Sequence, residues 1–172
     1  MREARQLLCL GLGVAVCLLA VPPTVAAQDK GIAVGTPAPA VVLADLKGQA
    51  VDLGQFIGKR PVMLEYWATW CTVCAKLMPR VRAVHDKYGR SVEFVGINVA
   101  VNQTVDRVQR YAAIEKPPFV ILYDAKGASA RAYKASTTSY IVIIDRHGKV
   151  AYTGVGTEQQ FEDALARVVA AP

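Results

Sequence analysis

The stretch LEYWATWCTVC, residues 64–74, joins a strand pattern to two cysteines that are separated by two residues. Residues 62–67 are apolar apart from one glutamate, which is typical of a strand covered on both faces. Helical spacing follows, so we expect Cys71 at a helix N-terminus and Cys74 buried one turn later. Free N–H groups and the helix dipole favour a thiolate at Cys71. The segment is therefore a candidate for disulfide exchange, in which Cys71 attacks and Cys74 releases the mixed disulfide.

The N-terminus has the pattern of a secretion signal over residues 1–27. Arg2 and Arg5 precede a long uncharged apolar stretch, and small residues stand before the expected cleavage point. Cleavage removes Cys9 and Cys17 and leaves the pair described above as the remaining thiols. An uncleaved membrane anchor is an alternative, because the apolar stretch approaches the length of a bilayer span.

The chain is mildly basic, with 20 Lys and Arg against 14 Asp and Glu and a formal net charge of +6. These charges are scattered without basic runs or interleaved aromatic residues, which argues against a nucleic-acid partner. In an oxidising compartment the two cysteines could also form a plain structural cross-link. A loop of two residues closes too little chain to stabilise a fold strongly, so a redox role is favoured.

Beyond a tether at residues 28–34, strands that alternate with helices predict one α/β domain over residues 35–172, with a mixed sheet covered by helices on both faces. Pro79 lies inside the helix that follows the cysteines and is expected to bend it. The expected strands cover residues 41–43 and 50–53 as an N-terminal hairpin, then 62–67, 91–99 and 119–123, and finally 140–145 and 149–153 as a second hairpin. The first expected helix follows the cysteines and ends at Tyr88. The other expected helices cover residues 104–114, 129–134 and 158–169.

Residues 64–74, Pro79 and the late hairpin sequence IIDRHG, residues 143–148, resemble the thioredoxin fold. The opening VGTPAP, residues 34–39, and residues 119–133 narrow the resemblance to the TlpA/ResA-like exported thiol-disulfide oxidoreductases. The likeness spans residues 35–169. It implies a periplasmic protein, free or tethered, that reduces protein disulfides in cytochrome c maturation or metal-centre assembly. It further implies a membrane electron donor of the DsbD/CcdA type and no cofactor besides the two sulfurs.

Two positions depart from this family. A cis-proline normally stands before the late strand and faces the cysteines, but Ser139, preceded by Thr138, holds that place. A cis bond before serine would cost about 3 to 4 kcal/mol, so we expect a trans peptide or a rearranged loop. Because the family uses this loop to hold the substrate backbone, Thr138 and Ser139 are candidate substrate-binding residues. The second departure is Val73, where many relatives have proline, and it leaves the direction of electron flow open.

Two further residues are candidates at the site. Glu65 is the single charge in an apolar strand, and an acidic residue at this position exchanges a proton with the second cysteine in thioredoxins. Burial would raise its pKa into a useful range; the alternative is a glutamate at a sheet edge that reaches solvent or a lysine. Trp70 is expected to flank Cys71 and to offer an apolar face to a substrate, whereas Trp67 is expected in the core.

Other functions remain as alternatives. The same dithiol could bind and deliver Cu(I), which thiolates select, and the serine in place of proline would leave room for a metal. A peroxiredoxin has a similar fold, but the proline and threonine that precede its peroxidatic cysteine are not found at the matching positions. His85 and His147 lack metal-ligand spacing to the cysteines, so we expect no zinc site.

Overall fold

The computed structural model describes residues 31–171, and the predicted secretion signal lies outside them. Within these residues a seven-stranded sheet has the order β2-β1-β5-β4-β3-β6-β7. Strands β3, β4 and β5 run parallel to one another. On one side of them β6 pairs antiparallel with β3 and β7 with β6, and on the other side β1 pairs antiparallel with β5 and β2 with β1. The strands are β1 Val42–Asp45, β2 Ala50–Asp52, β3 Val62–Trp67, β4 Glu93–Asn98, β5 Val120–Tyr123, β6 Tyr140–Ile144 and β7 Val150–Val155.

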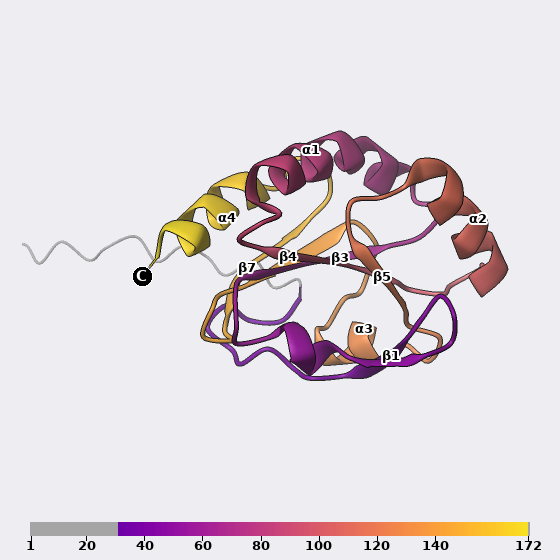
Figure 1. Ribbon diagram of the computed structural model, residues 1–172, viewed down its shortest axis with the longest axis horizontal. Coiled ribbons are helices and arrows are strands. Elements are labelled where there is room, and N and C mark those ends of the chain that lie inside the picture. The colour runs from indigo at the N-terminus through magenta and orange to yellow at the C-terminus, as the bar shows by residue number, and fades with distance from the viewer. Residues whose placement is uncertain (1–30, 172) are drawn as a thin grey trace, which may run out of the picture.

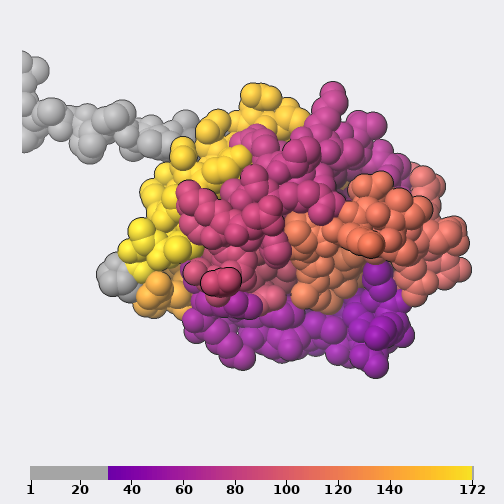
Figure 2. All heavy atoms as spheres, turned by 45° about the horizontal axis from the view of Figure 1, so that its top comes forward, coloured from indigo at the N-terminus to yellow at the C-terminus, as the bar shows by residue number. Residues whose placement is uncertain are grey.

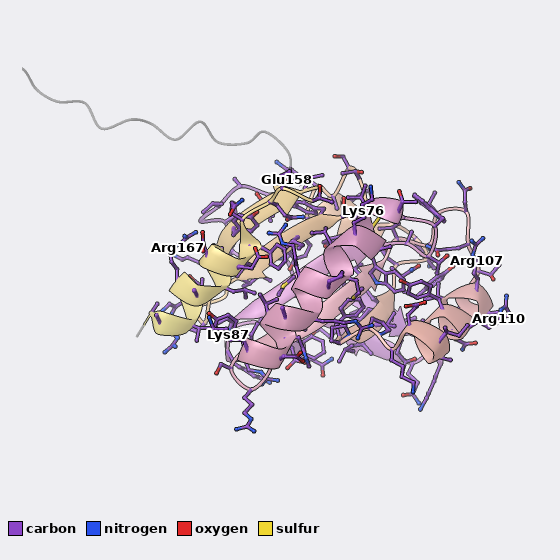
Figure 3. All side chains as sticks on the ribbon, turned by 90° about the horizontal axis from the view of Figure 1, so that it is seen from above. Lys76, Lys87, Arg107, Arg110, Glu158 and Arg167 are labelled. Atoms are coloured by element: carbon purple, nitrogen blue, oxygen red, sulfur yellow. A yellow bond between two sulfur atoms is a disulfide. The ribbon has the colours of Figure 1, made fainter. Side chains whose placement is uncertain are left out.

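Helices cover both faces of this sheet, as the sequence predicts (Figure 1). The helices are α1 Thr72–Tyr88, α2 Val105–Glu115, α3 Ala128–Ala132 and α4 Phe161–Ala170, with a short 3₁₀ helix, η1, at Leu53–Phe56. Helix α1 lies between α4 and α2 on one face (Figures 2 and 3), and α3 lies on the other face with η1. The long helix α1 thus crosses directly over the centre of the sheet.

Alternation along β3 divides the core into two layers, because successive side chains of a strand point to opposite faces. Leu64 and Tyr66 pack in the layer with α3, whereas Met63 packs beneath α1 and α4. All six residues of β3 are buried, so the strand is covered on both faces as expected. One apolar face of α1 is also buried as predicted, and α1 continues through Pro79 as one helix.

The N-terminal end of the described chain packs against the domain. Ile32, in the stretch predicted as a tether, is 5% exposed and belongs to the core layer that contains α3. Its N–H donates to Tyr133 O and to Tyr140 Oη, both at 3.0 Å. Among residues 31–171, no helix is long and apolar enough to cross a membrane.

Candidate active site

The two cysteines form a disulfide at the start of α1. Cys71 is the N-cap residue of the helix, and its Sγ accepts a hydrogen bond of 3.0 Å from the backbone N–H of Cys74. Cys71 N also donates to Ala68 O, which closes the turn between β3 and α1. When the pair is reduced, the same N–H and the helix dipole stabilise a thiolate at Cys71.

The disulfide lies at the edge of the core. Cys71 is 7% and Cys74 is 4% exposed, and both pack in a cluster with Trp67, Ala68 and Val108. Trp67 is buried against the rings of two aromatic residues, so its predicted core position is confirmed. Only a small part of each cysteine is therefore accessible to a reaction partner, at the rim of this cluster.

Trp70 stands on that rim and is 42% exposed. Its Nε1–H donates to Val101 O at 2.7 Å, which ties the indole to the loop between β4 and α2. In the same loop, Gln103 Oε1 accepts a 3.0 Å hydrogen bond from Thr69 N. Val101 and Val73 are exposed as well, so apolar side chains surround the approach to the disulfide.

Glu65 is buried in the middle of β3, at 1% exposure. It shares the α1 side of the strand with Met63 and Trp67, because all three alternate with residues of the opposite layer. Neither carboxyl oxygen has a hydrogen-bond partner among residues 31–171, and burial raises the pKa of Glu65 to about 8. The alternative of an edge glutamate that reaches solvent or a lysine is therefore wrong.

Strand pairing places Thr138 and Ser139 beside the cysteine turn. Tyr140, the first residue of β6, is paired with Tyr66 near the end of β3, so the preceding loop lies at the sheet edge where the cysteine turn begins. Every peptide bond in residues 31–171 is trans, and Ser139 has a φ of +56°. The expectation of a trans peptide in place of the family's cis-proline is confirmed. The Ser139 hydroxyl donates to Thr138 O at 2.5 Å and so is engaged within its own loop.

The described part of the chain contains no cluster of three or more His, Cys, Asp or Glu side chains that could hold a metal ion. His85 lies far along α1, where its ring packs edge-on against Phe94. It lines an open cleft of about 280 Å³ together with Arg60 and Glu93, which are paired with each other. This cleft and its paired charges belong to the opposite end of α1 from the cysteines.

Comparison with known proteins identifies the family. The family described as Redoxin matches residues 33–168. The chain belongs to the Redoxin family. It is 31% identical over 144 residues to the thiol-disulfide oxidoreductase ResA of Geobacillus kaustophilus, covering 82% of this chain and 81% of that protein. It is also 30% identical over 145 residues to the thioredoxin-like protein YneN of Bacillus subtilis, covering 83% and 84%.

A solved structure supports the same placement for this Redoxin chain. A putative thiol:disulfide interchange protein DsbE from Chlorobium tepidum superposes with a TM-score of 0.67 at 25% identity, covering 80% of this chain and 98% of that one. The fold is thioredoxin-like, and the resemblance to TlpA/ResA-like proteins is confirmed. This protein is a thiol-disulfide oxidoreductase with a Cys71–Cys74 redox pair.

Four residues at the site of this Redoxin protein escaped the sequence analysis: Val101, Gln103, Arg80 and Gln159. The first two hold Trp70 and Thr69 through a loop carbonyl and a side-chain amide. Gln159 donates to the carbonyl of Ser139, and Arg80 donates to the carbonyls of Thr157 and Gln159; both are described below. Each acts across a large sequence separation, so spacing along the chain gave no signal for them.

Proposed function

We propose that this protein reduces protein disulfides outside the cytoplasm, in cytochrome c maturation or metal-centre assembly. The observation that carries this proposal is the Cys71 Sγ, which caps α1, accepts the Cys74 N–H and lies beside the exposed Trp70. Relatives named thiol-disulfide oxidoreductase and a structural neighbour named as a DsbE support the choice of substrate class. The secretion-signal pattern supports export.

In the proposed reaction, the Cys71 thiolate attacks one sulfur of a substrate disulfide and the other substrate sulfur leaves as a thiolate. Glu65, in the molecules in which it is ionised, accepts the proton of the Cys74 thiol. The Cys74 thiolate then attacks Cys71 Sγ, and the second substrate sulfur leaves. The substrate gains two electrons, and Cys71 and Cys74 are left as a disulfide.

The reduced pair must be regenerated by another dithiol, and we propose a membrane electron donor of the DsbD/CcdA type. The apolar rim of Trp70, Val73 and Val101 would meet the substrate chain, with Thr138 and Ser139 on the other side of the sulfurs. The best support for a copper site was the replacement of proline by Ser139, which leaves room beside the sulfurs; the Ser139 hydroxyl itself donates to Thr138 O. The relatives named thiol-disulfide oxidoreductase favour electron transfer over copper delivery.

The test is to trap the intermediate. Cys74→Ser in the full chain leaves the attacking sulfur and removes the resolving one, so exported proteins should accumulate as mixed disulfides that a small dithiol releases. Cys71→Ser is the matched control and should trap nothing above background. If Cys71→Ser traps the same adducts, or if the unaltered reduced chain binds Cu(I) tightly and reduces no protein disulfide, the proposal is wrong.

A further inference from the structure

The carbonyl of Ser139 is held by two donors from a distant part of the chain. Gly156 N donates to Ser139 O at 3.2 Å, and Gln159 Nε2 donates to the same oxygen at 3.0 Å. A φ of +56° is rare for a residue other than glycine and persists only where the surroundings impose it. These two bonds hold the carbonyl of Ser139 in this conformation.

The Gln159 side chain is buried and held in place beside Ser139. It is 6% exposed, and its Nε2 also donates to Gly156 O at 2.7 Å. Gly154 makes room for it: a Cβ at that position would lie 2.7 Å from Gln159 Oε1 and would collide with the Tyr152 hydroxyl. Gln159 Oε1 itself has no hydrogen-bond partner among residues 31–171, so the side chain is placed by its amide donor.

Arg80 connects the brace, by which we mean the hydrogen bonds from Gly156 and Gln159 to Ser139 O, to the helix that carries the cysteines. Its guanidinium donates to Gln159 O at 2.6 Å and to Thr157 O, and it makes a bidentate ion pair with Glu162 at 2.6 Å for each bond. Figure 3 places Lys76, near the N-terminus of α1, at the same end of the molecule as Glu158. The 157–159 segment is thus anchored to α1 through Arg80, six residues after Cys74.

We propose that Gln159 is a positioning residue for exchange with protein substrates: it fixes the Ser139 backbone, and so shapes the surface that a substrate chain meets beside Cys71. This inference rests on Cys71 and Cys74 carrying the exchange, as proposed above. A protein substrate must align its backbone along this loop before its sulfur reaches Cys71. A small disulfide reaches the sulfur without that alignment, so the two substrates separate positioning from chemistry.

The experiment compares Gln159→Glu with the unaltered full chain in its dithiol form. The substitution keeps the side chain's size and removes the Nε2 donor, which would leave an oxygen facing Ser139 O. Insulin is the protein substrate and hydroxyethyl disulfide the small one. We expect kcat/KM for insulin to fall about five- to tenfold through a higher KM, as for one lost hydrogen bond. The rate with hydroxyethyl disulfide and the redox potential of the pair should stay unchanged.

Gln160→Glu is the matched control, since it makes the same chemical change at the exposed neighbouring residue and should alter neither rate. Gln159→Met serves where the carboxylate prevents folding, and the same selective loss is expected. Amide hydrogen exchange at Gly156 should accelerate in both Gln159 variants, which reports on the loop independently of any reaction. Parallel loss of both rates, no loss with insulin, or unchanged exchange at Gly156 would each overturn the inference. If the unaltered chain reduces neither substrate, the proposed function fails, and Gly156 exchange alone decides whether Gln159 braces the loop.

Discussion

The cysteine turn and the Ser139 loop flank the same end of β3, yet they are held by different kinds of contact. The two cysteines are held locally, because Cys71 and Cys74 bond to each other and to backbone groups within a few residues, although Thr69 and Trp70 in the same turn also bond to the loop between β4 and α2. The Ser139 loop is held by Gly156 and Gln159, and the bond from Gln159 spans 20 residues. The difference teaches that the reactive sulfurs and the surface beside them can be altered separately by mutation.

The largest expected effect is on the free energy of unfolding and comes from Glu65, which is buried in β3 before the cysteine turn. Burial raises the pKa of Glu65 from 4.5 to about 8, so the folded protein retains a proton that the unfolded chain releases between those pH values. The stability that the protonated Glu65 gives the folded protein is fully present below pH 4.5 and is lost as the pH rises to about 8. Glu65→Gln removes the dependence and should stabilise the protein at pH 7 by up to about 3 kcal/mol.

Urea unfolding across this pH range measures the effect. Glu158→Gln, at an exposed glutamate, is the control and should keep the slope of the unaltered protein. Glu65→Gln should also slow release of the mixed disulfide, since Cys74 loses its proton acceptor, while the first attack by Cys71 keeps its rate. A stability profile of Glu65→Gln that still falls over the same pH range would show that Glu65 is not the titrating group.

Much of the cysteine side could be predicted from the sequence because its determinants are neighbours in the chain. The apolar run of β3, the helical spacing after it and the cysteine pair lie within one short stretch, and the structure confirms the N-cap position of Cys71. The apolar neighbours of Glu65 favoured a buried position over an exposed one at a sheet edge, and the structure buries it. The order of strands and helices was predicted as well, apart from η1 and shifts of a few residues at element ends.

The brace around Ser139 could not be predicted, because it depends on how distant segments meet. Nothing in the run Glu158-Gln159-Gln160 distinguishes the buried glutamine from the exposed one. Arg80 reads as one of several charges on α1, although it reaches carbonyls more than 70 residues away. The pairing of β6 with β3 places Ser139 beside the cysteine turn, and the pairing of β6 with β7 places residues 156–159 beside Ser139.

Ser139→Pro gives the next largest effect and tests whether the Ser139 loop can be altered without altering the cysteine pair. Proline fixes φ near −65°, so it cannot adopt the φ of +56° observed here, although it restores the residue that the family carries. The loop must rearrange and lose the two hydrogen bonds to Ser139 O, which costs about 2 kcal/mol at about 1 kcal/mol each. Chemical unfolding measures this loss.

Ser139→Gly is the matched control for that substitution. Glycine adopts a positive φ without strain, and this gain offsets its larger entropy in the unfolded chain, so stability should change by less than about 1 kcal/mol. The redox potential of the cysteine pair should be the same in both variants, because its own contacts are local. A proline variant as stable as the serine protein would show that the loop accepts a second conformation at no cost.

Trp70→Phe has the smallest expected effect and tests whether the rim acts on substrate alone. The change keeps an aromatic face but removes the donor to Val101 O, an exposed hydrogen bond that contributes about 0.5 kcal/mol to stability. Insulin reduction should fall about two- to threefold, because the phenyl ring is smaller and has no N–H to fix it against the loop. Trp67→Phe is the contrasting variant. The centroid of the Trp67 ring lies 5.2 Å from that of Tyr111 in the core, so the substitution should lower the free energy of unfolding by about 1 to 3 kcal/mol. If Trp70→Phe destabilises the fold as much as Trp67→Phe and leaves insulin reduction intact, the rim is part of the core's support rather than a surface for substrate.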